Sequence, residues 1–427
     1  MNSVSLCLLI LLGSTFRPGI LGDYRIPDTR ASALAVTLSP RASWHSDSAD
    51  RYTTGLGIAP AVFFGISSER LYLDVDLSAA SEAVPLLHDF VDTGGVRSHS
   101  YGSEPKFNLL TDWYPSRLPI GLNGQASFTG TFWSSRNPTY GNRGAYLRGS
   151  GAAGPVFGRV RDATPVITAV RIAEILAAEN QLAKELDETE IQSLADLIAQ
   201  EWSYRAEHDA GRSEKYFYQS LERFLGPRSR DGQGLSAHTW FHIRDEINRA
   251  GYSSSLGYPA RPVGIRLALT AGDGLYHNVR TTIQETETTN LDEGGQYPMV
   301  GAELDGGWPL SLRLHASGSA SWQSVFYPYG TQHDFRSDIS LSYLVGELLQ
   351  LRASCVPAYE AEEDTSTGSW SRIYGASAWL SGTWYVEDRF TATTSAGLGS
   401  RVRTRHGYTP LRDLSTHIDV DFSYRIR

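Results

Sequence analysis

The sequence predicts an all-β fold: a transmembrane antiparallel β-barrel of about 14 strands (roughly 12 to 16) with an inserted α-helical domain. Three observations support this prediction. Apolar and polar residues alternate with period two in many stretches, as in strands with two different faces. Beyond the N-terminal region, no stretch reaches the roughly 18 uninterrupted apolar residues of a membrane-spanning helix. Between residues 164 and 251, apolar residues recur at helical spacing instead.

The stretch 415–427 shows the alternation most clearly. It continues for about ten residues, the length of a tilted strand that crosses a bilayer. One face is apolar, and the other mixes aspartate with arginine, as expected for a water-filled lumen. The apolar face comprises Ile418, Val420, Phe422, Tyr424 and Ile426, and the polar face Asp419, Asp421, Ser423, Arg425 and Arg427.

Similar alternation predicts the other strands, in two blocks that span residues 31–160 and 261–427. The stretch 144–157 is rich in glycine, and 297–304 alternates weakly. In the stretch 310–323, leucine, alanine and tryptophan alternate with serine, arginine and histidine. The predicted strands are 34–38, 52–66, 71–77, 107–113, 120–132 and 144–157, then 263–269, 297–304, 310–323, 335–343, 349–355, 374–384, 390–402 and 415–427.

The period changes between the two blocks, which predicts a helical insert over residues 163–252. Asp187 followed by Glu190 is the pattern of a capping box at a helix N-terminus. Ser213 is expected to cap a further helix that ends at Gly226, and Ser236 a last one that ends at Gly251. The insert therefore contains about four helices.

The C-terminal strand resembles the closing strand of Gram-negative outer-membrane β-barrels. Phe422 and Tyr424 carry the resemblance, although that family usually ends on an aromatic residue and this chain ends on Ile426 and Arg427. The resemblance is to the architecture and indicates no specific family. It implies a location in the bacterial outer membrane, in contact with lipid and lipopolysaccharide.

The connections between strands predict which side the insert occupies. Such barrels have short periplasmic turns and longer external loops. Short turns are expected after the second, fourth, eighth, tenth and twelfth strands, and longer loops at 79–100, 281–296, 360–369 and 404–413. This alternation places the insert, which follows the sixth strand, on the periplasmic side. Four packed helices are too wide for the lumen, so we expect them at its periplasmic mouth.

The N-terminal region and the composition bound the location and the partners. Residues 1–22 are expected to be a signal peptide, with the apolar run 6–12 as its core and Gly22 as the cleavage position. Removal of Cys7 with this segment leaves Cys355 without a disulfide partner. The net charge of -9 argues against a nucleic-acid partner.

Charged residues on the predicted inner face are the candidate functional residues. Opposing charges on the wall of a lumen can form the selectivity zone of a pore. They can equally form internal salt bridges that stiffen the wall, and the sequence does not separate the two roles. The candidate lumen-lining residues are Arg266, Arg313, His315, Arg336, Asp338, Arg352, Arg401, Asp419, Asp421 and Arg425.

Two other motifs invite a chemical interpretation. Gly149, Gly151 and Gly154 match a dinucleotide-binding pattern, but no helix is expected to follow them, so they are interpreted as strand glycines. His238 and His242 are four residues apart, with Asp245 close by. That spacing could hold a metal ion, yet the zinc-protease motif needs a glutamate where Thr239 stands. No metal and no cofactor is predicted.

Five tryptophans lie near the predicted strand ends: Trp44, Trp113, Trp133, Trp322 and Trp384. Those that face lipid are expected to anchor a barrel at the membrane interfaces.

Three functions fit these observations. The first is a channel or transport protein whose periplasmic helical domain gates the pore or docks a partner. The second is a scaffold or export component of an envelope assembly or secretion system. The third is an outer-membrane enzyme that acts on lipid or peptide. No serine–histidine or aspartate–histidine group is evident at the outer rim, so a non-enzymatic protein is expected.

Overall fold

A single antiparallel sheet dominates the computed structural model of the chain. The sheet has fourteen strands, and each strand pairs with the next one in the sequence. The described residues are 29–45, 51–68, 70–87, 97–115, 118–136, 140–201, 203–204, 210–230, 232, 234–253, 261–284, 287–327, 330–345, 349–364, 369–387, 390–405 and 410–424. The strands are β1 (Thr29–His45), β2 (Arg51–Ser67), β3 (Leu71–Leu87), β4 (Arg97–Trp113), β5 (Ile120–Arg136), β6 (Tyr140–Asp162), β7 (Pro262–Gln284), β8 (Glu287–Pro309), β9 (Leu314–Tyr327), β10 (Gly330–Val345), β11 (Leu349–Asp364), β12 (Ser369–Glu387), β13 (Phe390–Arg405) and β14 (Leu411–Tyr424).

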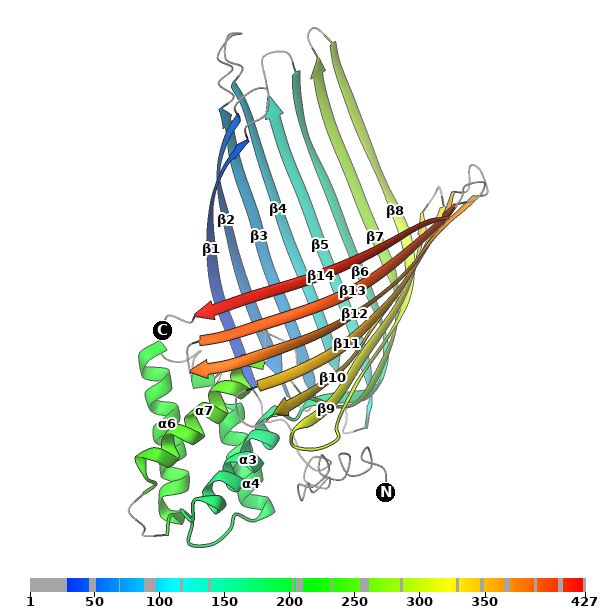
Figure 1. Ribbon diagram of the computed structural model, residues 1–427. Coiled ribbons are helices and arrows are strands. Elements are labelled where there is room, and N and C mark those ends of the chain that lie inside the picture. Colours follow the sequence, from blue (N-terminus) through cyan, green and yellow to red (C-terminus); the bar gives the residue numbers. More distant parts are fainter. Residues whose placement is uncertain are drawn as a thin grey trace.

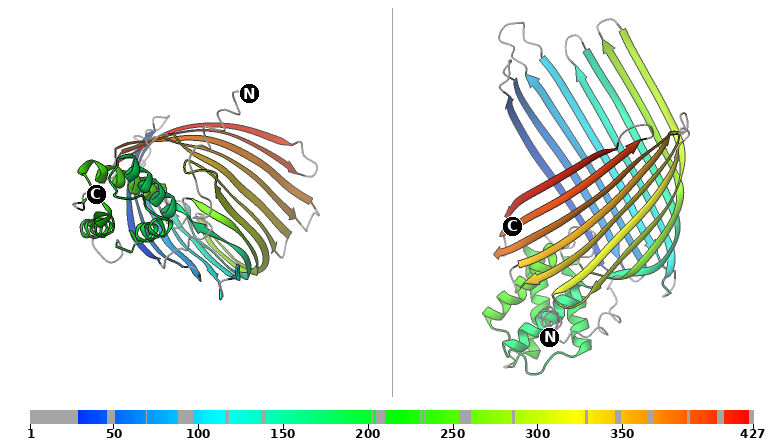
Figure 2. Two further views of the ribbon diagram at one scale, coloured as in Figure 1. Left: turned by 90° about the horizontal axis from the view of Figure 1, so that it is seen from below. Right: turned by 45° about the vertical axis from the view of Figure 1, so that its right-hand side comes forward.

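The sheet bends into a deep arc around an interior (Figures 1 and 2). In Figure 1, β1 to β8 rise steeply, while β10 to β14 run obliquely across the opposite side. The two edges of the sheet are β1 and β14, which do not pair with each other among the described residues. The strand count therefore matches the sequence prediction, and the described sheet is curved but not closed.

The outer face of this sheet is apolar. Leu267 and Leu269 on β7, Ile339 on β10 and Leu380 on β12 are exposed large side chains on that face. Residues at the alternate positions, such as Arg266 on β7, point to the interior and are buried. Apolar residues outside and polar residues inside are the arrangement of a sheet that meets lipid.

Aromatic rings mark the borders of the apolar face. Trp113, Trp308 and Trp384 are 49%, 58% and 57% exposed and lie close to the ends of β4, β8 and β12 at the helical end of the sheet. Tyr101 is exposed on the same face of β4, twelve residues before Trp113. At about 3.3 Å per residue and a tilt of about 45°, that separation corresponds to about 28 Å of membrane thickness.

Two predicted tryptophan anchors, Trp113 and Trp384, therefore lie at a border of the apolar face. Trp322 is also exposed on the outer face, but near the middle of the apolar band. Trp133 instead lies over Gly144 on the inner face, so it is not one of the lipid-facing anchors. The side chain of Trp44 lies outside the described residues.

The strands are longer than predicted and the external loops shorter. Most of the predicted loop 281–296 belongs to β7 and β8, and most of 79–100 belongs to β3 and β4. Six of the ten residues of 360–369 and five of the ten residues of 404–413 are likewise strand. Around the β7–β8 hairpin, every residue from 281 to 290 except Ile283 is polar, so the sequence there shows no alternation of apolar and polar residues.

The connection between β8 and β9 also differs from the prediction. The predicted turn 305–309 belongs to β8, and the predicted strand start 310–313 forms the turn. The backbone N–H groups of Leu310 and Ser311 donate to the carbonyl of Leu314. Leu312, at the tip, packs into the helical core described below, which explains an apolar residue in a turn.

Four α-helices lie between β6 and β7 in the chain. They are α3 (Thr164–Ala178), α4 (Glu188–Ala199), α6 (Ala210–Leu225) and α7 (Ala237–Ser253), with the short 3-10 helix η1 (Gly226–Arg228) after α6. In the described part of the chain, no helix is long and apolar enough to cross a membrane.

Local capping explains where the helices begin. The Asp187 carboxylate accepts from the backbone N–H of Glu190, whose carboxylate accepts from the backbone N–H of Asp187, so the predicted capping box at α4 is confirmed. Ser236 Oγ accepts from the backbone N–H of Thr239 at the start of α7, also as predicted. The prediction for Ser213 is wrong, because α6 begins at Ala210 and Ser213 is buried within it.

The helical core is fastened to the sheet. Leu312 from the β8–β9 turn is 3% exposed and belongs to the same buried cluster as Ile172 of α3 and Ile243 of α7. Val263 of β7 packs against this cluster, and the backbone N–H of Ala163 donates to the carbonyl of Arg261 at 3.0 Å. The helices therefore lie at one end of the sheet, held by apolar packing and by the paired linkers (Figure 1).

Candidate functional site

The inner wall carries a buried charge cluster around Arg266 on β7. Its guanidinium contacts both carboxylate oxygens of Asp112 on β4, with an NH2–Oδ1 distance of 3.0 Å. Its NH1 donates to Glu303 at 2.9 Å and to Asp305 at 2.7 Å, both on β8. One arginine side chain thus forms hydrogen bonds with three carboxylates. Because side chains on a strand alternate, this cluster faces the interior while Ile265 and Leu267 face outward.

Amide side chains complete the cluster. Asn123 Nδ2 donates to Asp112 Oδ1 at 2.7 Å, and Gln125 Nε2 donates to Glu303 Oε2 at 3.3 Å. Gly158, the register partner of Arg266 on β6, has a positive φ of 77°, and a Cβ there would lie 2.1 Å from the carbonyl oxygen of Ile265. Only glycine fits this position without strain. The cluster joins β4, β5, β7 and β8 across the inner surface.

A second inward cluster surrounds Tyr297 on β8. Arg148 Nε on β6 donates to the hydroxyl of Tyr297 at 2.9 Å, and its NH2 donates to the hydroxyl of Tyr327 at 3.3 Å. The rings of Tyr297 and Tyr327 lie 4.9 Å apart, and Tyr297 is buried. This arginine and its tyrosines were absent from the sequence prediction, although their parity on β6, β8 and β9 would have placed them inside.

Four aromatic rings on the inner wall lie over glycines of the neighbouring strand. In each pair the two residues are direct register partners. A Cβ on each glycine would approach the facing ring to 2.1–2.7 Å. The pairs are Trp133 with Gly144, Tyr297 with Gly274, Tyr276 with Gly295, and Trp379 with Gly397.

The sequence-predicted lining residues occupy different levels of the wall. Asp338 shares a cross-strand row with Arg266, through Asp305 and Ser319. Arg336 and Arg401 share a second row, linked by Ala358 and Gly375. The inner wall therefore carries charge at more than one depth.

His315 and Arg352 lie in a third row, joined by Ser342. His315 is buried, and neither ring nitrogen has a hydrogen-bond partner among the described residues. Arg313 lies in the β8–β9 turn and not in the strand predicted for it, and its charge acts on Glu174 of α3.

Three predicted lining residues cannot be placed. The side chains of Asp419 and Asp421 lie outside what the structure describes, although their backbones belong to β14. Arg425 lies outside the described residues altogether. The glycines Gly149, Gly151 and Gly154 lie within β6, which confirms their interpretation as strand residues.

These features define a class of protein. Fourteen sequential antiparallel strands, an apolar outer face of bilayer height bordered by tryptophan, and a charged inner face are the properties of an outer-membrane β-barrel protein. Such proteins reside in the bacterial outer membrane.

No protein-family model matches the chain, and no curated protein is similar to it. Solved structures that it resembles include the alcaligin outer membrane receptor FauA of Bordetella pertussis, with a TM-score of 0.36, 10% identity, and coverage of 93% of this chain and 58% of that one. The ferric yersiniabactin uptake receptor FyuA of Yersinia pestis gives 0.35 and 7% identity, over 90% of this chain and 50% of that one.

The translocator domain of the autotransporter NalP of Neisseria meningitidis gives a TM-score of 0.31 and 9% identity, over 93% of this chain and 94% of that one. This chain thus spans about half the length of the FyuA receptor. TM-scores this low carry no argument, so the class of protein rests on the strands and their two faces.

Proposed function

We propose that this chain is an outer-membrane channel whose sheet closes by pairing β1 with β14 and whose charged inner wall lines the path of the solute. The observation that carries the proposal is the contrast between the two faces of the sheet, with lipid-compatible side chains outside and Arg266, Arg336 and Asp338 inside. Closure is supported by a general constraint, because an open strand edge in lipid leaves backbone polar groups unsatisfied. In this proposal the wall passes solutes and performs no covalent chemistry.

The helices lie on the periplasmic side in this proposal. At their end of the sheet, Trp113 and Trp308 stand within a residue or so of the strand ends, so little of the sheet protrudes there. At the opposite end, β8 continues for nine residues beyond Gln296, which pairs with the exposed Leu275 of β7 at the edge of the apolar face. Barrels of this kind protrude mainly on the external side, so the protruding end is assigned to the outside.

The helical segment serves as a fixed docking element for a periplasmic partner. Its core includes Leu312 and is packed by Val263, both from the sheet, so movement of the whole segment as a gate requires breaking buried apolar contacts. A scaffold or export role is the second candidate. It is favoured by the Arg266 cluster and the Tyr297 cluster, which fill part of the interior with buried side chains.

Conductance of the refolded protein in planar bilayers tests the channel. The expected result is a steady conductance in the intact chain, with a shift of the reversal potential toward cations in Arg336→Glu. Arg223→Glu, the same charge change on α6, is the matched control and should leave the selectivity unchanged. Folded protein without conductance would reject the channel and favour the scaffold.

A shortened chain separates a gate from a dock. Asp162 and Pro262 are register partners, so residues 163–261 can be replaced by a short turn without altering the β6–β7 hairpin. Equal conductance with and without these residues supports a docking role. Conductance that appears only in the shortened chain would instead assign the helices a gating role.

A further inference from the structure

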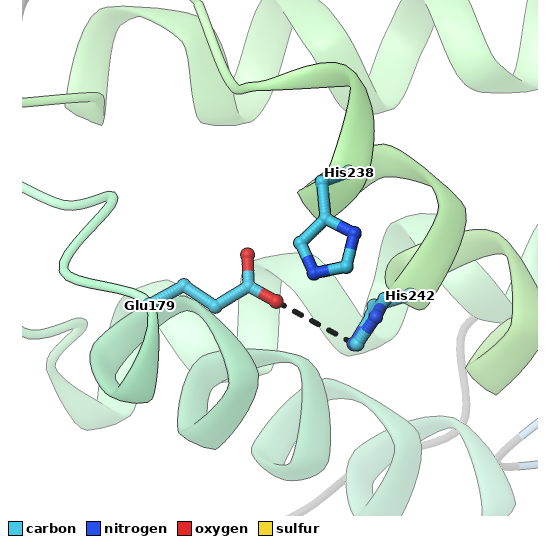
Figure 3. A group of neighbouring side chains, drawn as sticks. All are labelled: Glu179, His238 and His242. Atoms are coloured by element: carbon cyan, nitrogen blue, oxygen red, sulfur yellow. Dashed lines mark ion pairs between the residues drawn. The ribbon is translucent and has the colours of Figure 1, made fainter.

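Three side chains with metal-binding atoms converge in the helical segment. His238 and His242 stand one turn apart on α7, the spacing noted in the sequence. The third is Glu179 at the C-cap of α3, not Asp245. Figure 3 shows all three side chains pointing toward one another. Helical spacing could predict the histidine pair, but only the packing of α3 against α7 supplies the glutamate.

The distances suit a single metal ion. The three ligand atoms all lie within 4.8 Å of one another, and Nδ1 of His242 lies 3.4 Å from Oε1 of Glu179. Two ligand atoms on a tetrahedral zinc ion are separated by about 3.3 Å when each bond is about 2.0 Å long. The centroids of the two imidazole rings are 4.4 Å apart, so the two rings lie close enough to share one ion.

The end of α3 and a hydrogen bond from Thr239 fix the position of the Glu179 carboxylate. Asn180 adopts a left-handed conformation with φ 52°, which ends α3 and leaves Glu179 at its terminus. The buried hydroxyl of Thr239 donates to Oε2 of Glu179. Since that hydroxyl has one proton, the 2.7 Å contact between Ser236 and Thr239 has Ser236 as its donor. Thr239 therefore fixes one carboxylate oxygen and leaves Oε1 facing His242, as supporting residues do at metal sites.

The electrostatics favour a cation at this point. The C-terminus of a helix carries partial negative charge, so the carboxylate of Glu179 adds to an already negative site. Within the described part of the chain, no lysine or arginine pairs with Glu179.

We propose that Glu179, His238 and His242 bind one divalent transition-metal ion, with Zn²⁺ as the best match to two imidazoles and one carboxylate. His238 is exposed, so the fourth coordination position opens to solvent and is taken by water or by a side chain of a docked partner. Glu179 ends the helix that leaves β6, and His238 begins the helix that returns to β7. The site therefore lies at the end of the α3–α7 pair remote from the sheet, away from the inner wall, and is independent of conduction.

Equilibrium binding of Zn²⁺ to the metal-free, refolded full chain tests the proposal. The expected stoichiometry is one ion per chain, with affinity falling at least tenfold in His242→Ala and in Glu179→Gln. Protons should compete with the ion for the imidazole nitrogens, so binding should weaken as the solution is acidified. With Co²⁺ in place of Zn²⁺, the parent protein should show the visible absorption of a tetrahedral site, and His242→Ala and Glu179→Gln should not.

Two further variants sharpen the test. Thr239→Val keeps all three ligands but removes the supporting hydrogen bond, so it should lower Zn²⁺ affinity by roughly 10-fold. His277→Ala removes an exposed histidine on β7 and should leave binding unchanged. Helical circular dichroism shows whether each variant is folded. His238 is exposed, so His238→Ala still tests the site if substitution of a less exposed ligand disturbs folding. Absence of binding to folded protein, or equal affinity in the parent, His238→Ala and Glu179→Gln, would overturn the site.

Discussion

Glycine faces an aromatic ring at four places on the inner wall, and each ring uses the space that a Cβ would occupy. Among these rings, the position of Tyr297 is fixed by burial and by the hydrogen bond that its hydroxyl accepts from Arg148. These contacts make the glycine at position 274 a packing requirement. They also show how a strand of small residues can support large inward side chains on its neighbour.

Gly274→Ala is expected to destabilise the sheet. Its Cβ would lie 2.1 Å from the ring of Tyr297, which cannot move without losing its bond to Arg148. We expect a loss of about 1–3 kcal/mol in the free energy of unfolding, measured by denaturant titration in detergent. Gly149→Ala is the control, because the nearest atom to its added Cβ is 3.8 Å away. Equal stabilities of the two variants would contradict the packing argument.

Parity along a strand predicts which face a residue occupies, but not which residues it meets. Arg266 and Asp338 were therefore placed on the inner face from the sequence alone. The carboxylates around Arg266 come from β4 and β8, and their convergence depends on register and curvature, which no local pattern encodes. Glu179 was missed for the same reason, since it lies 59 residues from His238 in the sequence.

The starts of α4 and α7 were predictable from the sequence, because capping is a local interaction. Asp187 and Glu190 satisfy each other's backbone N–H groups, and the pattern is visible in four consecutive residues. Strand ends were the least predictable. Apolar and polar residues alternate only where one face of a strand contacts lipid. The alternation therefore stops where β7 and β8 leave the apolar band, although both strands continue.

The start of α4 should respond to pH. The hydrogen bond from Arg228, at 2.8 Å, and the one from the backbone of Asp187 hold the pKa of Glu190 below its usual value. A depressed carboxyl pKa contributes stability above the unfolded-state pKa of about 4.5, and this contribution is lost as pH falls through the folded-state value. Because Glu190 is partly exposed, we expect on the order of 0.5 kcal/mol.

Thermal unfolding followed by helical circular dichroism measures this effect. The stability of the helical segment should fall between about pH 6 and pH 3, and Glu190→Gln should show a smaller fall. Lys184→Gln, a charge change on an exposed residue nearby, should retain the parent profile. Identical pH profiles for the parent and Glu190→Gln would assign the acid sensitivity to other carboxylates.

Closure of the sheet is a property of the whole molecule, and amide hydrogen exchange can test it. In an antiparallel edge strand, alternate backbone N–H groups point away from the only neighbour and have no partner. If β14 pairs with β1, consecutive amides from Leu411 to Tyr424 should be protected alike, as in the interior strand β11. Fast exchange at every second residue of β14 would show an open edge.

In the proposed orientation, the long outer strands raise the entrance of the molecule above the membrane. Nine residues of β8 lie beyond Gln296, and at about 3.3 Å each and a tilt of about 45° they correspond to about 21 Å of height. The end of the β7–β8 hairpin then stands above the bilayer surface. In the proposed channel, a solute would pass this part of the wall before it reaches the charges at the level of the lipid, so part of the selection among solutes would take place outside the bilayer.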